Sequence, residues 1–110
     1  MKIKFYLKSS GRSPVEEFLK ELPEPTRLEV FDALAQLEAG KNLEMPLSKN
    51  LSSIRFGLHE LRFRDKAGQV RVIYYIKRGD AIYLLHAYRK KTQAISSKDM
   101  DMILKRLKEI

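Results

Sequence analysis

The sequence predicts one α+β domain that spans residues 1–110, with its elements in the order βααβββα. An antiparallel meander sheet is expected to pack on a helical hairpin, and a C-terminal helix follows. In the first half of the chain, apolar residues recur at helical spacing on either side of Pro23 and Pro25. In the second half they alternate with polar residues between glycine-containing turns. A length of 110 residues suits one domain with a modest core.

The first half predicts a strand and two helices. Alternation places the strand at about residues 2–8. The segment from Ser13 to Glu16 combines a capping serine, a proline at the first helical position and a glutamate three residues after the cap, so a short helix is expected from here to about Leu22. A second helix is expected from Thr26 to Ala39. Its core face is expected to hold Leu28, Phe31, Leu34 and Ala35.

The second half predicts the sheet. Residues 41–53 are expected to form an irregular surface loop. Three antiparallel strands follow at about 58–64, 69–78 and 81–88, and Gly79-Asp80 has the composition of a two-residue hairpin turn. The last helix is expected to begin at Ser96-Ser97, with Met100, Ile103, Leu104 and Leu107 on one face. Its acidic residues come first and its basic residues last, as the helix dipole favours.

Composition limits the chemistry available to the chain. It has no cysteine, which excludes a disulfide framework, a thiol nucleophile and zinc sites built on sulfur. Its two histidines do not suffice for a histidine-rich metal site, so no metal and no cofactor is expected. No apolar run approaches the roughly 18 residues that a membrane helix needs. The N-terminus also lacks the apolar block of a secretory signal, and we expect a cytoplasmic protein without membrane contact.

The positive charge lies mostly in the second half of the chain. The formal net charge is +8, from 22 Lys and Arg against 14 Asp and Glu. Residues 1–57 carry nine basic and eight acidic side chains, whereas residues 58–110 carry 13 and six. The densest cluster is Arg89-Lys90-Lys91. This excess fits either a polyanion site or a solvated sheet edge protected by lysine, and charge alone does not separate the two.

Pairing in the first hairpin is expected to bring two arginines together. If Arg64 pairs with Gln69, Arg62 lies directly opposite Arg71. Facing guanidiniums repel each other, which is destabilising unless an anion lies between them. That anion is either a bound phosphate or Glu60, which shares the face of Arg62 and would reduce the site to a ladder of ion pairs.

The second hairpin extends the same face. If Arg78 pairs with Ala81, Tyr88 comes opposite Arg71 and His86 joins the face. A slip of one residue in this turn would move His86 and Tyr88 to the core side. The residues expected on the core side are Leu61, Phe63, Val70, Val72, Tyr74, Ile76, Tyr83, Leu85 and Ala87.

This set of residues suits cleavage of RNA without a metal. Arg62 and Arg71 can bind phosphate oxygens and stabilise the charge that develops at phosphorus. RNA carries its own nucleophile, the 2′-hydroxyl, so the remaining need is proton transfer, for which His86 titrates in the right range. A hydrogen-bonded structural role fits His86 as well.

Three further residues are candidates for holding the RNA chain. Tyr88 can stack on a base, and Lys90 and Lys91 can bind flanking phosphates. The two lysines fit a solvated turn as well. His59 is expected to be structural, because it shares the parity of Leu61 along its strand.

Three segments give the chain a resemblance to known proteins: Gly57–Arg62 (GLHELR), Val70–Tyr74 (VRVIY) and Leu84–Gln93 (LLHAYRKKTQ). The sequence resembles the RelE/ParE toxin superfamily, and within it the phage-derived HigB-like branch, over nearly the whole chain. The resemblance implies a RelE-like fold and the toxin half of a bacterial type II toxin–antitoxin system. Such toxins resemble ribosome-dependent endoribonucleases that cut mRNA and so inhibit translation and growth. A helix-turn-helix (HigA-like) antitoxin neutralises them.

The resemblance also implies roles for individual residues. Arg62 and Arg71 match the strand arginines of the family. Lys90 and Lys91 match its basic residues after the last strand, and His86 matches the usual histidine of the branch. The chain departs from the family pattern in having Val70 rather than an aromatic residue before Arg71. It also lacks the tyrosine that some relatives carry in the terminal segment, and this second departure leaves the identity of the general base open.

Two other functions are compatible with the same residues. A ParE-like toxin would inhibit DNA gyrase without acting as an enzyme, and fold alone does not choose between these activities. A degenerate member of the superfamily would act only as a protein-binding or RNA-binding module.

Overall fold

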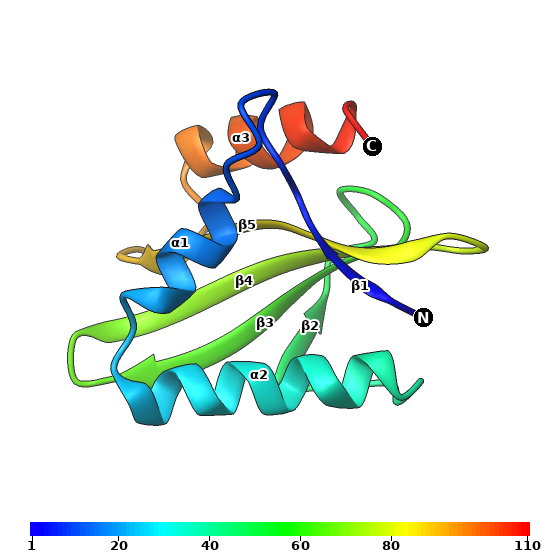
Figure 1. Cartoon of the computed structure of the whole chain (residues 1–110). Helices are drawn as coiled ribbons and strands as arrows, with labels where there is room; N and C mark the ends of the chain where they lie inside the picture. Colours follow the sequence, from blue (N-terminus) through cyan, green and yellow to red (C-terminus); the bar gives the residue numbers. More distant parts are fainter.

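The computed structural model describes all of residues 1–110 and contains five strands and three helices (Figure 1). The α+β class and the expected helices and strands are confirmed, and a further strand, β2, lies in the stretch that we expected to be irregular. In chain order the elements are β1 (Ile3–Phe5), α1 (Pro14–Lys20), α2 (Glu24–Glu38), β2 (Ser48–Asn50), β3 (Leu58–Asp65), β4 (Gly68–Lys77), β5 (Ala81–Lys90) and α3 (Ser97–Leu107).

All strands form one sheet in the order β1-β5-β4-β3-β2. β1 runs parallel to β5, and every other neighbouring pair is antiparallel. The helical hairpin of α1 and α2 packs against one face of the sheet and α3 packs against the other, and Figure 1 shows α2 and α3 on opposite sides. None of the helices is both long and apolar enough to cross a membrane.

Two of the helices begin at serine caps: Ser13 caps α1 as predicted, and Ser96 caps α3 where the sequence predicts a helix start. The Ser13 hydroxyl accepts a hydrogen bond from the Glu16 amide at 3.3 Å at the start of α1. The Ser96 hydroxyl accepts one from the Asp99 amide at 3.1 Å at the start of α3. Each cap satisfies an N–H group that the first helical turn leaves without a partner.

The buried face of α2 differs from the prediction. Leu34 is buried, but Leu28 and Phe31 are 59% and 43% exposed, and Ala35 is exposed as well. Asp32 lies one turn after Leu28, so burial of Leu28 would bring a carboxylate towards the core at a high cost in free energy. The helix instead buries a stripe without charges, formed by Val30, Ala33, Leu34 and Leu37.

The hairpin between β4 and β5 also differs from the prediction. Lys77 pairs with Ala81, so the turn has three residues rather than two, with Gly79 at its centre at φ +79°. A β-bulge between Ile73 and Tyr74 then shifts the register back by one residue. The pairs of Arg71 with Tyr88 and of Ile73 with His86 therefore form as predicted.

The bulge changes which residues of β5 face each layer. Tyr83 and Leu85, expected on the side of the helical hairpin, pack in the cluster beneath α3. Ile82 and Leu84 contact the hairpin side instead, and Ala87 lies there as predicted. This part of β5 is apolar on both faces because helices cover both faces, so alternation alone misplaces it.

Candidate nucleic-acid interface

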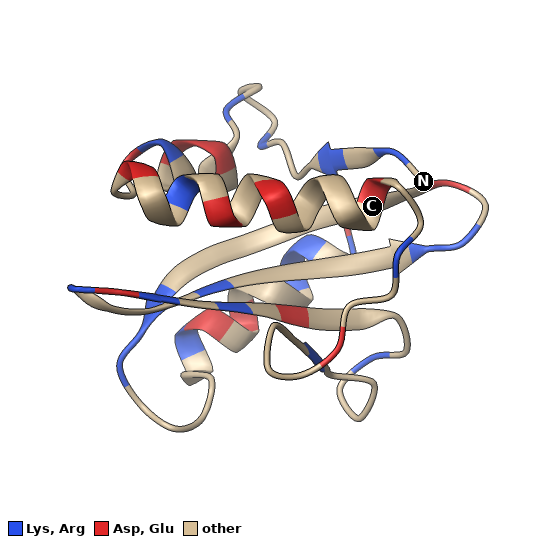
Figure 2. Cartoon of the chain, turned by 90° about the horizontal axis from the view of Figure 1, so that it is seen from below, with Lys and Arg blue, Asp and Glu red and all other residues tan.

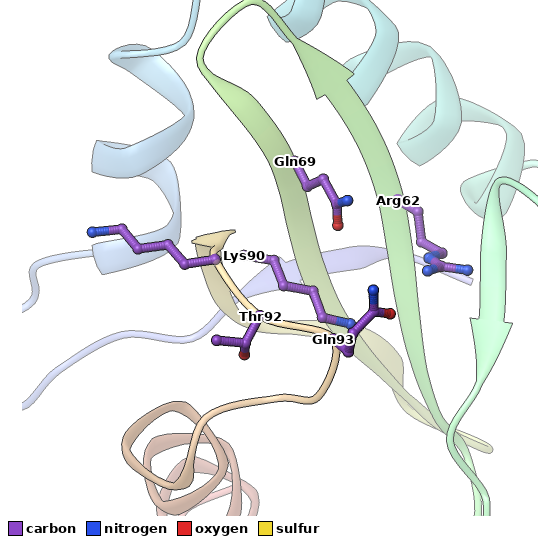
Figure 3. Close-up of a pocket in the computed structure, with 6 residues that line it drawn as sticks. Arg62, Gln69, Lys90, Thr92 and Gln93 are labelled. Atoms are coloured by element: carbon purple, nitrogen blue, oxygen red, sulfur yellow. The ribbon is translucent and has the colours of Figure 1, made fainter.

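A hydrophilic pocket of ≈ 300 Å³ opens where β5 ends beside β3 and β4 (Figure 3). We call it the cationic pocket. None of its lining residues is apolar and none is acidic, while half of them are cations, so it attracts anions. The lining residues are Arg62, Gln69, Lys90, Lys91, Thr92 and Gln93.

Strand register brings these side chains together. Gln69 at the start of β4 pairs with Lys90 at the end of β5, and on the other side of β4 Arg71 pairs with Arg62. The chain then leaves the sheet, and the Thr92 hydroxyl donates a hydrogen bond to the Ala94 carbonyl at 2.7 Å. The end of β5 and the turn after it therefore form one wall of the pocket, opposite Arg62.

Glu60 lies between the two facing arginines. Its Oε1 is 3.7 Å from Nε of Arg62 and 3.6 Å from Nε of Arg71. The Glu60 side chain is only 1% exposed. The anion that this arginine pair requires is thus supplied by the protein itself, which is the second of the two arrangements that the sequence allowed.

Arg71 lies beneath the pocket rather than in its lining. Its Nη1 donates hydrogen bonds to the carbonyls of Phe63 and Val70, and its Nη2 donates to Gln69 Oε1 at 2.6 Å. Burial lowers the pKa of Arg71, which the nearby Glu60 carboxylate opposes. Arg71 therefore orients the Gln69 amide, whose nitrogen makes no hydrogen bond within the protein and remains available to a ligand.

The surroundings of Lys90, one of the cations in the pocket lining, lower its pKa. Burial lowers the pKa of Lys90, and repulsion from Arg71 and Arg62 lowers it further, while Glu60 acts in the opposite direction. A lysine with a lowered pKa gives up a proton more readily than an exposed lysine does. Lys90 is therefore a candidate for proton transfer as well as for binding phosphate.

Arg89 belongs to the same sequence cluster but not to the pocket. Its guanidinium donates hydrogen bonds to both carboxylate oxygens of Asp65, at 2.7 Å and 2.9 Å. This bond holds the pKa of Asp65 below its usual range. Successive side chains of a strand point to opposite faces, so Arg89 and Lys90 diverge.

His86 faces α3 and does not line the cationic pocket. Its Nε2 is 2.7 Å from Asp99 Oδ1, and its Nδ1 is 3.4 Å from Arg106 Nη1. Burial lowers the pKa of His86; Asp99 raises it and Arg106 lowers it, and the net direction is downward. In this arrangement a neutral ring donates its Nε2–H to Asp99 and accepts from Arg106 at Nδ1, so both nitrogens have partners.

Tyr88 is nearly buried, at 7% exposure. Its hydroxyl donates a hydrogen bond to Glu60 Oε2 at 3.4 Å, and its ring stacks on His86 with the centroids 5.1 Å apart. Burial and the Glu60 carboxylate both raise the pKa of Tyr88. The Tyr88 hydroxyl therefore helps to hold the Glu60 carboxylate in place, and His86 already covers one face of the Tyr88 ring.

The structure thus divides the candidate residues into two groups. Arg62, Lys90 and Lys91 meet in the cationic pocket. Arg71, His86 and Tyr88 lie in the layer behind it, where they contact Glu60, Gln69 and α3. Sequence reasoning missed Gln69, Thr92 and Gln93 as parts of the site. For Gln69 the available signal was its pairing with Arg64, two residues along each strand from the arginine pair and therefore on the same face.

The meander sheet, the helical hairpin against one of its faces and the cationic pocket near the end of β5 define a RelE-like α+β domain. A family model described as "Phage derived protein Gp49-like (DUF891)" matches residues 17–108. The chain belongs to this family, which is a family of RelE-like toxins. No curated protein matches the chain significantly.

Proposed function

We propose that the chain is the toxin of a type II toxin–antitoxin system, of the HigB-like branch, and that it cleaves mRNA on the ribosome without a metal ion. The observation that carries the proposal is the convergence of Arg62, Lys90 and Lys91 in a pocket without carboxylates. Membership of a family of RelE-like toxins supports the toxin role. In this proposal the toxin acts in the cytoplasm, and its antitoxin is a HigA-like helix-turn-helix protein.

The proposed reaction is an attack by the 2′-oxygen on the adjacent phosphorus. A new O–P bond forms, the bond from phosphorus to the 5′-oxygen breaks, and the 2′-hydroxyl loses its proton to a base. Arg62 and Lys91 bind the non-bridging oxygens and stabilise the added negative charge. Lys90, with its lowered pKa, supplies the proton that the leaving 5′-oxygen takes up.

Arg71 and His86 take different parts in this scheme. Arg71 acts as a positioning residue, because its hydrogen bonds hold Gln69 and the strand carbonyls below the phosphate site. His86 is proposed for proton transfer. For this step one of its nitrogens must exchange Asp99 or Arg106 for the substrate, which requires α3 to shift relative to β5. Tyr88 is proposed to contact RNA in that same shifted state.

The test is induced expression in a bacterium, followed by mapping of 5′ ends across the mRNA pool. The native chain should arrest growth and create new mRNA ends. Lys90→Ala should reduce cleavage by roughly 10²-fold, the usual cost of losing one transition-state group. Lys66→Ala, in the exposed turn between β3 and β4, should keep full activity. Arrest with intact mRNA would overturn the proposal, and broken DNA would favour gyrase inhibition.

RNA binding without cleavage is a second candidate function. It is favoured by the engagement of both His86 nitrogens and by the lack of a carboxylate in the pocket lining. The same expression experiment separates the two, because a binding module would leave the mRNA ends unchanged. RNA affinity lost in Lys90→Ala, but not in Lys66→Ala, would then identify the cationic pocket as the binding site.

A further inference from the structure

Gln69 is an uncharged side chain in the lining of the cationic pocket. It lies near the start of β4, where it pairs with Arg64 of β3 on one side and with Lys90 of β5 on the other. Figure 2 shows the basic positions at the end of β5 and beside the turn between β3 and β4. Figure 3 shows the Gln69 side chain on the same side of the sheet as Arg62 and Lys90. Gln69 therefore offers the pocket a neutral group among cations.

The orientation of the Gln69 amide is fixed by Arg71. Nη2 of Arg71 donates a hydrogen bond to Gln69 Oε1 at 2.6 Å, and the Arg71 side chain is only 6% exposed. A guanidinium can only donate hydrogen bonds, so a flipped amide would place its NH2 group against another donor. The amide oxygen therefore faces Arg71. The NH2 group makes no hydrogen bond within the protein and is left for a ligand in the pocket.

The other uncharged side chains of the pocket are less prepared to bind a ligand. The Thr92 hydroxyl donates its proton to the Ala94 carbonyl at 2.7 Å, and Gln93 is exposed and makes no side-chain hydrogen bond. Binding through Gln93 would cost the conformational entropy of ordering its side chain. Because Arg71 already orders Gln69, the Gln69 amide is the neutral donor that binds at the lowest entropic cost.

The hydrogen-bond acceptors of an RNA chain differ in charge, and so do the donors of the pocket. Phosphate oxygens are charged, and Arg62, Lys90 and Lys91 provide charged donors, which bind them roughly twice as strongly as neutral donors do. Beside each phosphate, RNA also carries an uncharged group that DNA lacks, the 2′-hydroxyl, which can accept a hydrogen bond. The neutral amide of Gln69 is matched to this hydroxyl.

We propose that Gln69 is a specificity-determining residue that distinguishes RNA from DNA. Its amide NH2 donates a hydrogen bond to the 2′-hydroxyl of the nucleotide whose phosphate lies in the cationic pocket. This role rests on the proposed function for its RNA ligand, though not on cleavage of that RNA. Arg62 and the two lysines bind phosphates, which RNA and DNA share, so discrimination between the sugars falls to Gln69.

The probes for the experiment are a labelled hexanucleotide of uridine and the matching hexanucleotide of deoxyuridine, which differ only in their 2′-hydroxyls. Fluorescence anisotropy with the full chain, without ribosomes, measures both affinities, and a gel after each titration checks that the RNA is intact. The native chain should bind the RNA about fivefold more tightly, as expected for one hydrogen bond. Gln69→Met keeps the length of the side chain but removes the NH2 group, and should reduce this preference to less than about twofold.

Two variants provide the controls. Gln93→Met makes the same change in the same pocket and should keep a preference of about fivefold. Lys90→Ala removes a phosphate contact, so it should weaken binding of RNA and DNA by the same factor and also keep the preference. A disturbance of the structure around Arg71 would likewise weaken both nucleic acids equally. The ratio of the two affinities therefore reports on the 2′-hydroxyl.

Loss of the role of Gln69 and loss of the proposed function give different results. No preference in the native chain, or an unchanged preference in Gln69→Met, would overturn the role of Gln69 while RNA binding stands. Equal weakening of RNA and DNA by Gln69→Met would overturn it too, because the amide would then bind a phosphate or a base. If Lys90→Ala changes neither affinity, the cationic pocket is not the RNA site and both proposals fail. A preference that depends on Gln69, without mRNA cleavage in cells, would exclude the nuclease alone.

Discussion

The carboxylate of Glu60 lies between Arg62 and Arg71, with Oε1 3.7 Å from Nε of the first and 3.6 Å from Nε of the second. The side chains of Glu60 and Arg71 are 1% and 6% exposed, so this contact forms where water screens charge poorly. One carboxylate shared by two guanidiniums converts a repulsive cross-strand pair into an attractive cluster. The pairing of β3 with β4 at this point therefore depends on Glu60.

Glu60→Gln should lower the free energy of unfolding by about 3 kcal/mol, because removal of one member of a buried charge cluster leaves the others without compensation. Glutamine keeps the shape of the side chain, so the change tests the charge rather than the packing. Urea unfolding followed by circular dichroism measures the difference. Glu44→Gln, at an exposed position, should change it by less than about 0.5 kcal/mol. Equal effects of the two substitutions would contradict the role given to Glu60.

A comparison of Gly57 with Gly79 separates the cost of a steric clash from the cost of backbone strain when glycine is replaced by alanine. Both have positive φ, +92° and +79°, but a Cβ at Gly57 would lie 2.9 Å from the Ile76 carbonyl oxygen, and one at Gly79 would meet nothing within 4 Å. Gly79→Ala should cost about 1 kcal/mol for the left-handed conformation. Gly57→Ala should cost at least about 2 kcal/mol, since the clash with backbone adds to the strain. Urea unfolding of both variants checks the order, and equal costs would show that the contact with Ile76 relaxes freely.

Local rules predicted the parts of the fold that depend on neighbours in sequence. The caps at Ser13 and Ser96 follow from hydrogen bonding within one helical turn. The pairing of Arg62 with Arg71 follows from the turn between β3 and β4, because a short hairpin fixes its own register. The bulge that restores the pair of Arg71 with Tyr88 has no local signal in the sequence. The predicted register is correct at this pair because the longer turn and the bulge shift it by one residue in opposite directions.

Contacts between distant segments were beyond local rules. α3 covers part of the sheet face that alternation leaves polar, and through Asp99 and Arg106 it engages the nitrogens of His86. Nothing in the spacing of the last helix indicates which strand residue it will contact. The sequence placed these residues on one face of the sheet, as the structure does, but it did not separate Lys90, which lines the pocket, from His86, which lies behind it.

His86 should make stability depend on pH. Its pKa in the folded state is lowered by burial, so the unfolded state binds the proton more readily and stability falls as pH falls below about 6.5. The loss stops once pH is below the folded pKa. In His86→Gln this contribution disappears, and the free energy of unfolding should decrease less between pH 7.5 and pH 5.5 than it does in the native chain. Urea unfolding at the two pH values measures the change.

His59 provides the comparison for this measurement. Burial lowers the pKa of His59 also, without a charged partner, so it contributes to the pH dependence in the same direction. The effects of His59→Gln and His86→Gln on the pH dependence should add in the double variant, because the two rings lie on opposite faces of the sheet and titrate independently. An unchanged pH dependence in His86→Gln would mean that the ring is protonated with equal ease in both states.

The salt dependence of RNA binding counts the cations that reach phosphate. Arg62, Lys90 and Lys91 line the pocket whereas Arg71 lies beneath it, so three contacts are expected. For single-stranded RNA the logarithm of affinity should fall against the logarithm of salt with a slope of about −2, at ~0.7 per contact. Lys90→Ala should reduce the slope by about 0.7, and Lys66→Ala should leave it unchanged. Anisotropy titrations of a labelled oligonucleotide between about 50 and 200 mM salt measure the slopes. A native slope near −3 would mean that Arg71 turns outward and joins the pocket when RNA binds.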